Sequence, residues 1–169
     1  MKRGKTLIIV GAVALAFWYF TTQSKRLDIG AAAVSSVKLT GGSIRINVRI
    51  PVINRSDFSV TVSNFLGSLL YGGASIGTTQ LVSQATLPGR SQSFLEFSTS
   101  VSLLSVATST PLLGILNALA FKYLNVSLPG LPVQMPTPDQ LPGLLKSLRI
   151  RGTLYLGAIG IDVNEPLTV

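Results

Sequence analysis

Few residues in this chain are of types that perform catalysis, and the absent types exclude most enzyme chemistries. The sequence of 169 residues contains neither cysteine nor histidine. This excludes disulfides, cysteine nucleophiles, zinc sites built from Cys and His, haem ligation through His, and every triad that uses imidazole as its base. We therefore expect a protein that is not an enzyme, with no catalytic residues, no metal site, no cofactor and no small-molecule substrate.

Three patterns resemble catalytic or ligand sites but fit a structural role better. Ser35 and Lys38 have the S-x-x-K spacing of acylating enzymes, which needs a helix, whereas positions i and i+3 of a strand face opposite ways. The glycine-rich segment 72–77 lacks the helix and downstream acid of a dinucleotide site, which favours a hairpin turn. The acidic residues are scattered without metal-loop spacing.

The one constellation that indicates binding is a set of four arginines, Arg45, Arg49, Arg149 and Arg151. Each pair alternates along its own predicted strand. If the two strands were neighbours, the guanidinium groups would form a ladder able to hold lipid phosphates, nucleic acid or an acidic protein. The alternative is a solvated face whose charges prevent edge pairing. Nucleic acid is the least favoured ligand, because no aromatic side chain is interleaved with these arginines.

The elements that position these residues are mostly strands. Apolar residues alternate with polar ones from Ser43 to Val52, a polar turn follows at 54–57, and alternation resumes at Phe58, which predicts a hairpin with one apolar face. Further strands are predicted at 34–39, 74–82, 93–106 and 148–156, with an edge strand at the C-terminus. We expect an all-β fold, an immunoglobulin-like or fibronectin-like β-sandwich of about seven strands, because a hairpin with one apolar face needs a second layer.

One helix interrupts the strands, within a connection that spans 107–145. Pro111 to Leu124 has proline in the first turn and apolar residues at helical spacing. It is too short to span a bilayer and is expected against the sheets or at a membrane surface. Five prolines fall between 128 and 143, which indicates an ordered extended loop or a docking segment. The candidate docking residues are Leu112, Leu116, Leu131 and Met135.

An apolar segment near the N-terminus predicts a membrane anchor. Residues 6–24 carry no charge over 19 positions, follow a basic tail (1–5) and precede a linker (25–33) that leads into the domain at 34–169. As a helix this segment would span roughly 28 Å, close to the thickness of the hydrocarbon core. The predicted anchor residues are Leu7, Ile8, Ile9, Val10, Phe17, Trp18, Tyr19 and Phe20. A cleaved signal peptide is the alternative, disfavoured by bulky aromatics where small residues would prepare cleavage.

The net charge of +8 is largely a property of this anchor. Five of the fourteen basic residues flank the apolar segment, and the remainder of the chain has nine Lys and Arg against six Asp and Glu. Three basic residues precede the segment and two follow it, which favours a cytoplasmic N-terminus and a domain outside the cell or in the periplasm.

The order of these elements resembles the late embryogenesis abundant type 2 family, the water stress and hypersensitive response domain. The similarity runs from Val34 to Val163 and rests on the alternating strand before Asn54, the glycine-rich hairpin at 70–77, the helix from Pro111 and the closing strand at 151–156. At the turn, Asn54 is followed by Arg55 where many members have proline. The resemblance implies a seven-stranded β-sandwich, usually non-enzymatic, linked to stress protection or to membrane surfaces.

These observations predict a single-pass membrane protein whose β module acts through binding or structure at a membrane surface. Its partners would be the lipid bilayer and other proteins, in a homo- or hetero-oligomer. The alternative is a structural, membrane-associated component of a larger assembly such as a lipid-containing virion, in which the helix and proline-rich loop would be docking surfaces.

Overall fold

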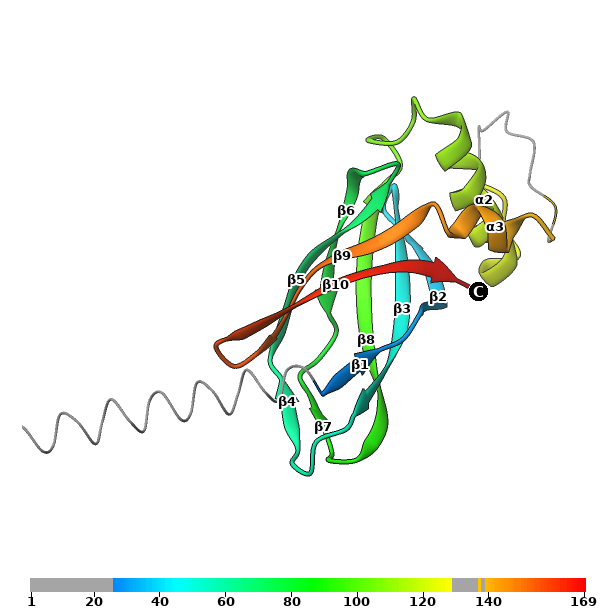
Figure 1. The fold of residues 1–169 in the computed structure, drawn as a ribbon. Helices are drawn as coiled ribbons and strands as arrows, with labels where there is room; N and C mark the ends of the chain where they lie inside the picture. The colour runs from blue at the N-terminus through cyan, green and yellow to red at the C-terminus, as the bar shows by residue number, and fades with distance from the viewer. Residues whose placement is uncertain (1–25, 129–136, 138) are drawn as a thin grey trace, which may run out of the picture.

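The computed structural model describes residues 26–128, 137 and 139–169. Ten strands and two helices are assigned in this part of the chain. The helices gather at one end of an elongated β structure, and the first described strand begins toward the other end (Figure 1).

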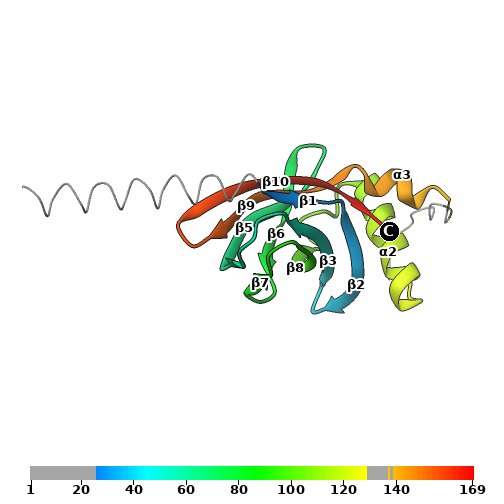
Figure 2. The same ribbon diagram turned by 60° about the horizontal axis from the view of Figure 1, so that its bottom comes forward.

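Seven strands close into a barrel. They are β2 (Ala32–Thr40), β3 (Ser43–Asn54), β5 (Asn64–Tyr71), β6 (Ala74–Leu81), β8 (Ser91–Ser102), β9 (Leu148–Leu156) and β10 (Ile159–Thr168). Around the barrel the order is β3, β2, β10, β9, β5, β6, β8 and back to β3. The neighbours are antiparallel except β2 and β10, which are parallel. Figure 2 shows the strands curving around one interior.

The predicted β-sandwich is therefore wrong. β3 pairs with β8 along its whole length on one side and with β2 from Ser43 to Arg49 on the other, so β3 is not an edge at which one sheet could end. Pairing of β10 with β2 completes the ring, and closure removes the exposed strand edges that an open sheet must protect.

The hairpin predicted on either side of the Asn54 turn is also wrong. The short strand after the turn, β4 (Val60–Val62), pairs with β7 (Ala85–Leu87) rather than returning along β3. The place beside the end of β3 is taken by β1 (Leu27–Ile29), in the register Leu27 opposite Asn54.

The barrel interior holds the residues that the alternation of β3 predicts. Ile44, Ile46, Val48, Ile50 and Val52 are at most 1% exposed. Phe97 of the neighbouring β8, opposite Val48, and Phe65 of β5 are buried in the same core, and their rings meet edge to face with centroids 4.9 Å apart. Such a pair adds about 0.5–1.5 kcal/mol to the stabilisation that comes from burial alone.

Helix α2 (Thr110–Leu124) matches the helix predicted from Pro111 to Leu124. Proline stands in its first turn, and Asn125 ends it in the left-handed conformation, donating its N–H to the carbonyl of Phe121 at 2.9 Å. Every residue from Leu112 to Ala120 is buried, as expected of a helix that is apolar on all sides.

A tyrosine hydrogen bond connects α2 to the barrel wall. The Tyr123 hydroxyl donates to the carbonyl oxygen of Val34 on β2 at 2.8 Å. Burial raises the pKa of Tyr123 above its ordinary value, because the charged phenolate is poorly solvated there.

A second helix, α3 (Leu141–Leu145), was not predicted and lies at the end of the proline-rich stretch. Leu141 and Leu145 are buried beside α2, so this stretch contributes to the core. Proline at the start of α3 is compatible with a helix, because the first turn has no intrahelical partner for its N–H groups.

The transmembrane helix predicted over residues 6–24, with its anchor side chains, lies outside the described residues. Within the described ranges, none of the helices combines the length and apolar character that a membrane crossing requires.

Candidate functional site

The outer wall of four neighbouring strands, β2, β3, β8 and β6, forms an open polar depression of about 830 Å³. We call it the trough. Strand alternation turns most apolar residues of these strands inward and leaves mainly polar and charged side chains outside. Because the four strands are in register, the outward residues stand in rows across the wall.

The first row is basic and hydroxylic. Lys38 lies opposite Arg45, Arg45 opposite Ser100, and Ser100 opposite Thr78. The second row is uncharged and consists of Ser36, Asn47, Ser98 and Gln80. Asn47 donates from Nδ2 to Oγ of Ser36 at 2.9 Å, which orients its amide.

The third row contains a compensated ion pair. Arg49 lies opposite Glu96 and donates from Nη2 to its Oε1 at 2.7 Å. The same guanidinium lies over the ring of Phe94, 5.4 Å from the centroid. Both charged side chains are about half exposed, so the pair contributes little to stability, roughly 0–1 kcal/mol.

Two cations of the trough have no such compensation. Within the part of the chain that the structure describes, the side chains of Lys38 and Arg45 make neither a hydrogen bond nor a salt bridge. Like charges directly opposite each other on neighbouring strands are destabilising. Glu96 is the single carboxylate among the described lining residues, and it is engaged by Arg49.

The predicted four-arginine ladder does not form. β3 and β9 are not neighbours in the barrel, so Arg45 and Arg49 stand on one wall and Arg149 and Arg151 on another. Arg149 instead donates from Nε to Oδ1 of Asn164 at 2.9 Å and from Nη2 to its carbonyl oxygen at 2.8 Å. Sequence reasoning also missed Lys38 as a site residue, although it is outward on a strand that could pair with β3.

The four predicted docking residues do not form a described surface, because two are buried in the core and two lie outside the described residues. Leu112 and Leu116 of α2 are 1% and 0% exposed, so neither presents a side chain to a partner. Leu131 and Met135 lie outside the described residues.

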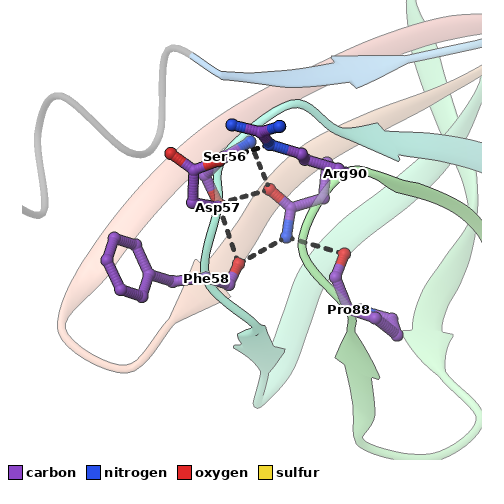
Figure 3. Close-up of polar contacts among 6 residues, drawn as sticks. Ser56, Asp57, Phe58, Pro88 and Arg90 are labelled. Atoms are coloured by element: carbon purple, nitrogen blue, oxygen red, sulfur yellow. Dashed lines mark hydrogen bonds and ion pairs between the residues drawn. The ribbon is translucent and has the colours of Figure 1, made fainter.

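A second polar cluster surrounds the buried side chain of Asn54 at the end of β3 (Figure 3). Its Nδ2 donates to three carbonyl oxygens, those of Phe58, Leu87 and Pro88, at 2.9, 3.0 and 3.0 Å. Its Oδ1 accepts from the backbone N–H of Ser56 at 3.0 Å and from the Ser56 hydroxyl at 2.6 Å. With these contacts Asn54 ties the β3–β4 turn to the loop after β7.

Charged residues close the outer side of this cluster. Arg90, with a positive φ of 49°, donates its N–H to the carbonyl of Ser56 at 2.8 Å and forms a salt bridge with Asp57. Arg55 forms a salt bridge with Asp28 and donates its N–H to the carbonyl of Arg26 at 2.9 Å. The start of the described chain is therefore attached to the Asn54 turn.

We call this end of the barrel, where β1 begins, the proximal end, and the end that carries α2 and α3 the distal end. The ring of Phe58 points away from the Asn54 cluster (Figure 3), and 56% of this residue is exposed. The proximal end thus carries the exposed ring of Phe58 and the salt-bridged guanidinium groups of Arg55 and Arg90.

Comparisons with known proteins add little to this geometry. No protein-family model matches the chain, and no curated protein matches it. Among solved structures, a crystal structure of a protein from Archaeoglobus fulgidus is similar at a TM-score of 0.47 and 11% identity, over 81% of this chain and 90% of that one. The resemblance to the late embryogenesis abundant type 2 family stays a prediction, and the β-sandwich that it implied is not the fold found.

Proposed function

We propose that this protein is a non-enzymatic binding module held at a membrane surface, with its proximal end toward the bilayer. The N-terminal apolar segment at 6–24 supplies the attachment, and the barrel presents the trough on its side wall. The basic residues before that segment favour an extracytoplasmic position for the barrel.

The observation that carries the proposal is the composition of the proximal end. In the sequence, Arg26 follows the apolar segment closely. Its carbonyl accepts a hydrogen bond from the N–H of Arg55, in the turn that also contains the exposed Phe58. An exposed Phe ring can bury itself at the acyl boundary, as the apolar residues of interfacial segments do, and an Arg side chain can keep its charge among the headgroups. The attachment would therefore bring this end, rather than the helical end, to the lipid.

The proposal of a binding role rests on residue types. Cysteine and histidine are absent from the sequence, and the trough pairs its one described carboxylate with an arginine. Apart from Leu81 and Val82, its remaining side chains carry hydroxyls, amides and cations, which recognise ligands by hydrogen bonding and charge.

Single-cysteine labelling tests the orientation, because the natural chain contains no cysteine. The full chain carrying Phe58→Cys, labelled with a fluorophore and reconstituted in phosphatidylcholine vesicles, should be quenched by lipids that carry a nitroxide. The matched control is Leu104→Cys, a residue 88% exposed in the segment between β8 and α2, which should not be quenched. Equal quenching at both positions, or stronger quenching at 104, would refute the proposed orientation.

Attachment is tested separately by alkaline carbonate extraction of membranes that contain the full chain. We expect the protein in the membrane pellet and expect a variant lacking residues 6–24 in the supernatant. Release of the intact protein would contradict membrane anchoring.

The alternative role, a component of a larger membrane-associated assembly, receives no comparable support. It relied on α2 and on the proline-rich loop as docking surfaces. The side chains of α2 from Leu112 to Ala120 are buried in the core, and most of the loop lies outside the described residues.

A further inference from the structure

We infer that the trough binds an acidic carbohydrate, with its carboxylate or phosphate on Lys38 and Arg45 and its hydroxyl groups on the polar floor. The inference deepens the proposed binding role by naming the ligand class. It does not require that the barrel sit in a particular orientation on a membrane.

The charges of Lys38 and Arg45 are not compensated by a described carboxylate. Lys38 and Arg45 are opposite each other on paired strands, where two like charges weaken the sheet. An anion between them would turn repulsion into two charge-assisted hydrogen-bond contacts, and the fork of Arg45 matches a carboxylate or phosphate. Binding of a ligand with a negative group at this point of the wall would therefore relieve the repulsion between Lys38 and Arg45.

A polar floor lies beside these two cations. Ser36, Asn47, Ser98 and Gln80 form an unbroken polar row, next to Ser100 and Thr78. Hydroxyl and amide groups both donate and accept hydrogen bonds, so they complement a ligand rich in hydroxyls. A simple anion would leave this row unused.

The shape of the trough suits an elongated ligand. The trough is open and crosses four strands, which at about 4.8 Å per strand gives a width of roughly 15 Å. Its volume of about 830 Å³ lies within the usual range of ligand sites, roughly 300–1,000 Å³. An elongated ligand of a few sugar rings fits such a surface, and the open sides permit a longer chain to continue past it.

Two other polyanions fit less well. Single-stranded nucleic acid is held mainly by base stacking on aromatic side chains, and the described lining contains none. An extended acidic peptide would gain affinity by pairing with a strand edge, but along the trough the backbones of β3 and β8 are already paired on both sides.

Calorimetric titration of the full chain in neutral detergent micelles tests the inference, with tetragalacturonate as the acidic probe and maltotetraose as its neutral counterpart. We expect the acidic tetramer to bind and the neutral one not to bind. Lys38→Gln and Arg45→Gln should each weaken binding at least tenfold. The matched control, Arg151→Gln, removes an exposed cation from the β9 wall and should leave the affinity unchanged.

Several results would overturn the inference. One is an affinity of Arg45→Gln for tetragalacturonate equal to that of the wild type. Another is binding of maltotetraose or of tetraglutamate as tight as that of tetragalacturonate. The last is displacement of tetragalacturonate by an equimolar amount of inorganic phosphate, which would indicate an adventitious ion only. The thermal unfolding midpoint of each variant shows that it is folded, as expected for exposed positions. Because the micelles contain no lipid bilayer, failure here leaves the labelling test of the proposed orientation unaffected.

Discussion

At the scale of single residues, Asn54 shows how a turn residue becomes a tertiary connection. The sequence indicates an Asn-led turn, and the structure buries this side chain completely with five hydrogen bonds to four different residues. A buried amide is stable only when its donors and acceptors are satisfied, and here they are.

Replacing Asn54 by alanine should therefore be costly. Asn54→Ala leaves the carbonyl of Leu87 and the N–H of Ser56 buried without these partners, and we expect the free energy of unfolding to fall by about 3 kcal/mol. The measurement is chemical denaturation of the full chain in micelles. Asn164→Ala, which removes an exposed hydrogen bond to Arg149, should cost less than about 1 kcal/mol. Similar losses for both variants would contradict this role of Asn54.

A second residue-scale prediction concerns the pH dependence of stability. Burial raises the pKa of Tyr123, so above about pH 10 the unfolded chain loses the phenolic proton while the folded chain keeps it. The stability that the neutral Tyr123 contributes is thus complete below pH 10 and is lost as the pH rises through the folded pKa.

The difference in unfolding free energy between wild type and Tyr123→Phe isolates this effect. At neutral pH the variant should be less stable by about 1 kcal/mol, because the bond to the Val34 carbonyl is gone. Above pH 10 the difference should shrink. A difference that stays constant up to pH 12 would show that Tyr123 titrates alike in both states.

At the scale of elements, the close approach of β5 and β9 depends on two glycines. Gly67 lies opposite Gly152, and the ring of Phe65 packs over this part of the wall. A Cβ on Gly152 would lie 2.5 Å from the Cα of Gly67 and against the backbone oxygen of Leu66. The backbone of both strands would have to separate to accommodate it.

We expect Gly152→Ala to lower the unfolding free energy by about 2 kcal/mol, because steric overlap with backbone atoms cannot be relieved by a rotamer change. The matched control is Gly143→Ala in α3, where the added Cβ meets no heavy atom within 4 Å. That variant should be unchanged or more stable by up to about 1 kcal/mol, since alanine favours the helix. The reverse order of stabilities would contradict this account.

At the scale of the whole molecule, the strand pairings of the barrel differ in length. The pairing of β3 with β8 is long, and the pairing of β10 with β2, which we call the seam, is short. β3 and β8 pair from Ser43 opposite Ser102 to Asn54 opposite Ser91. By contrast, β10 meets β2 in the register pairs Leu167–Ala32 and Thr168–Ala33, supplemented by a bond from the Thr168 hydroxyl to the Ala32 carbonyl at 3.1 Å. Ring closure depends on this short parallel contact.

Hydrogen exchange should therefore detect opening at the seam before global unfolding. Amides at Ala32–Val34 and Leu167–Thr168 should exchange through a lower-energy opening than those of β3 and β8. Leu167→Ala, at a fully buried position, should accelerate exchange at the seam, whereas Val169→Ala, at 41% exposure, should not. Uniform protection around the barrel would contradict a weak seam.

The sequence by itself determined the local features. Period-two alternation in β3 identified the buried face, because a strand must turn one side to the core, and the proline and apolar spacing identified α2. It likewise placed Arg45 and Arg49 outward. These inferences hold because strand and helix periodicity depend only on neighbouring residues.

Only the tertiary structure decided which strands are neighbours. Alternation is the same in a sandwich and in a barrel, so it could not show that β3 lies between β2 and β8, far from β9. Because of that arrangement the predicted four-arginine ladder does not form, and Lys38 lies opposite Arg45. Cross-strand partners are fixed by long-range backbone pairing, whose order around a closed sheet is not encoded in the pattern of any one strand.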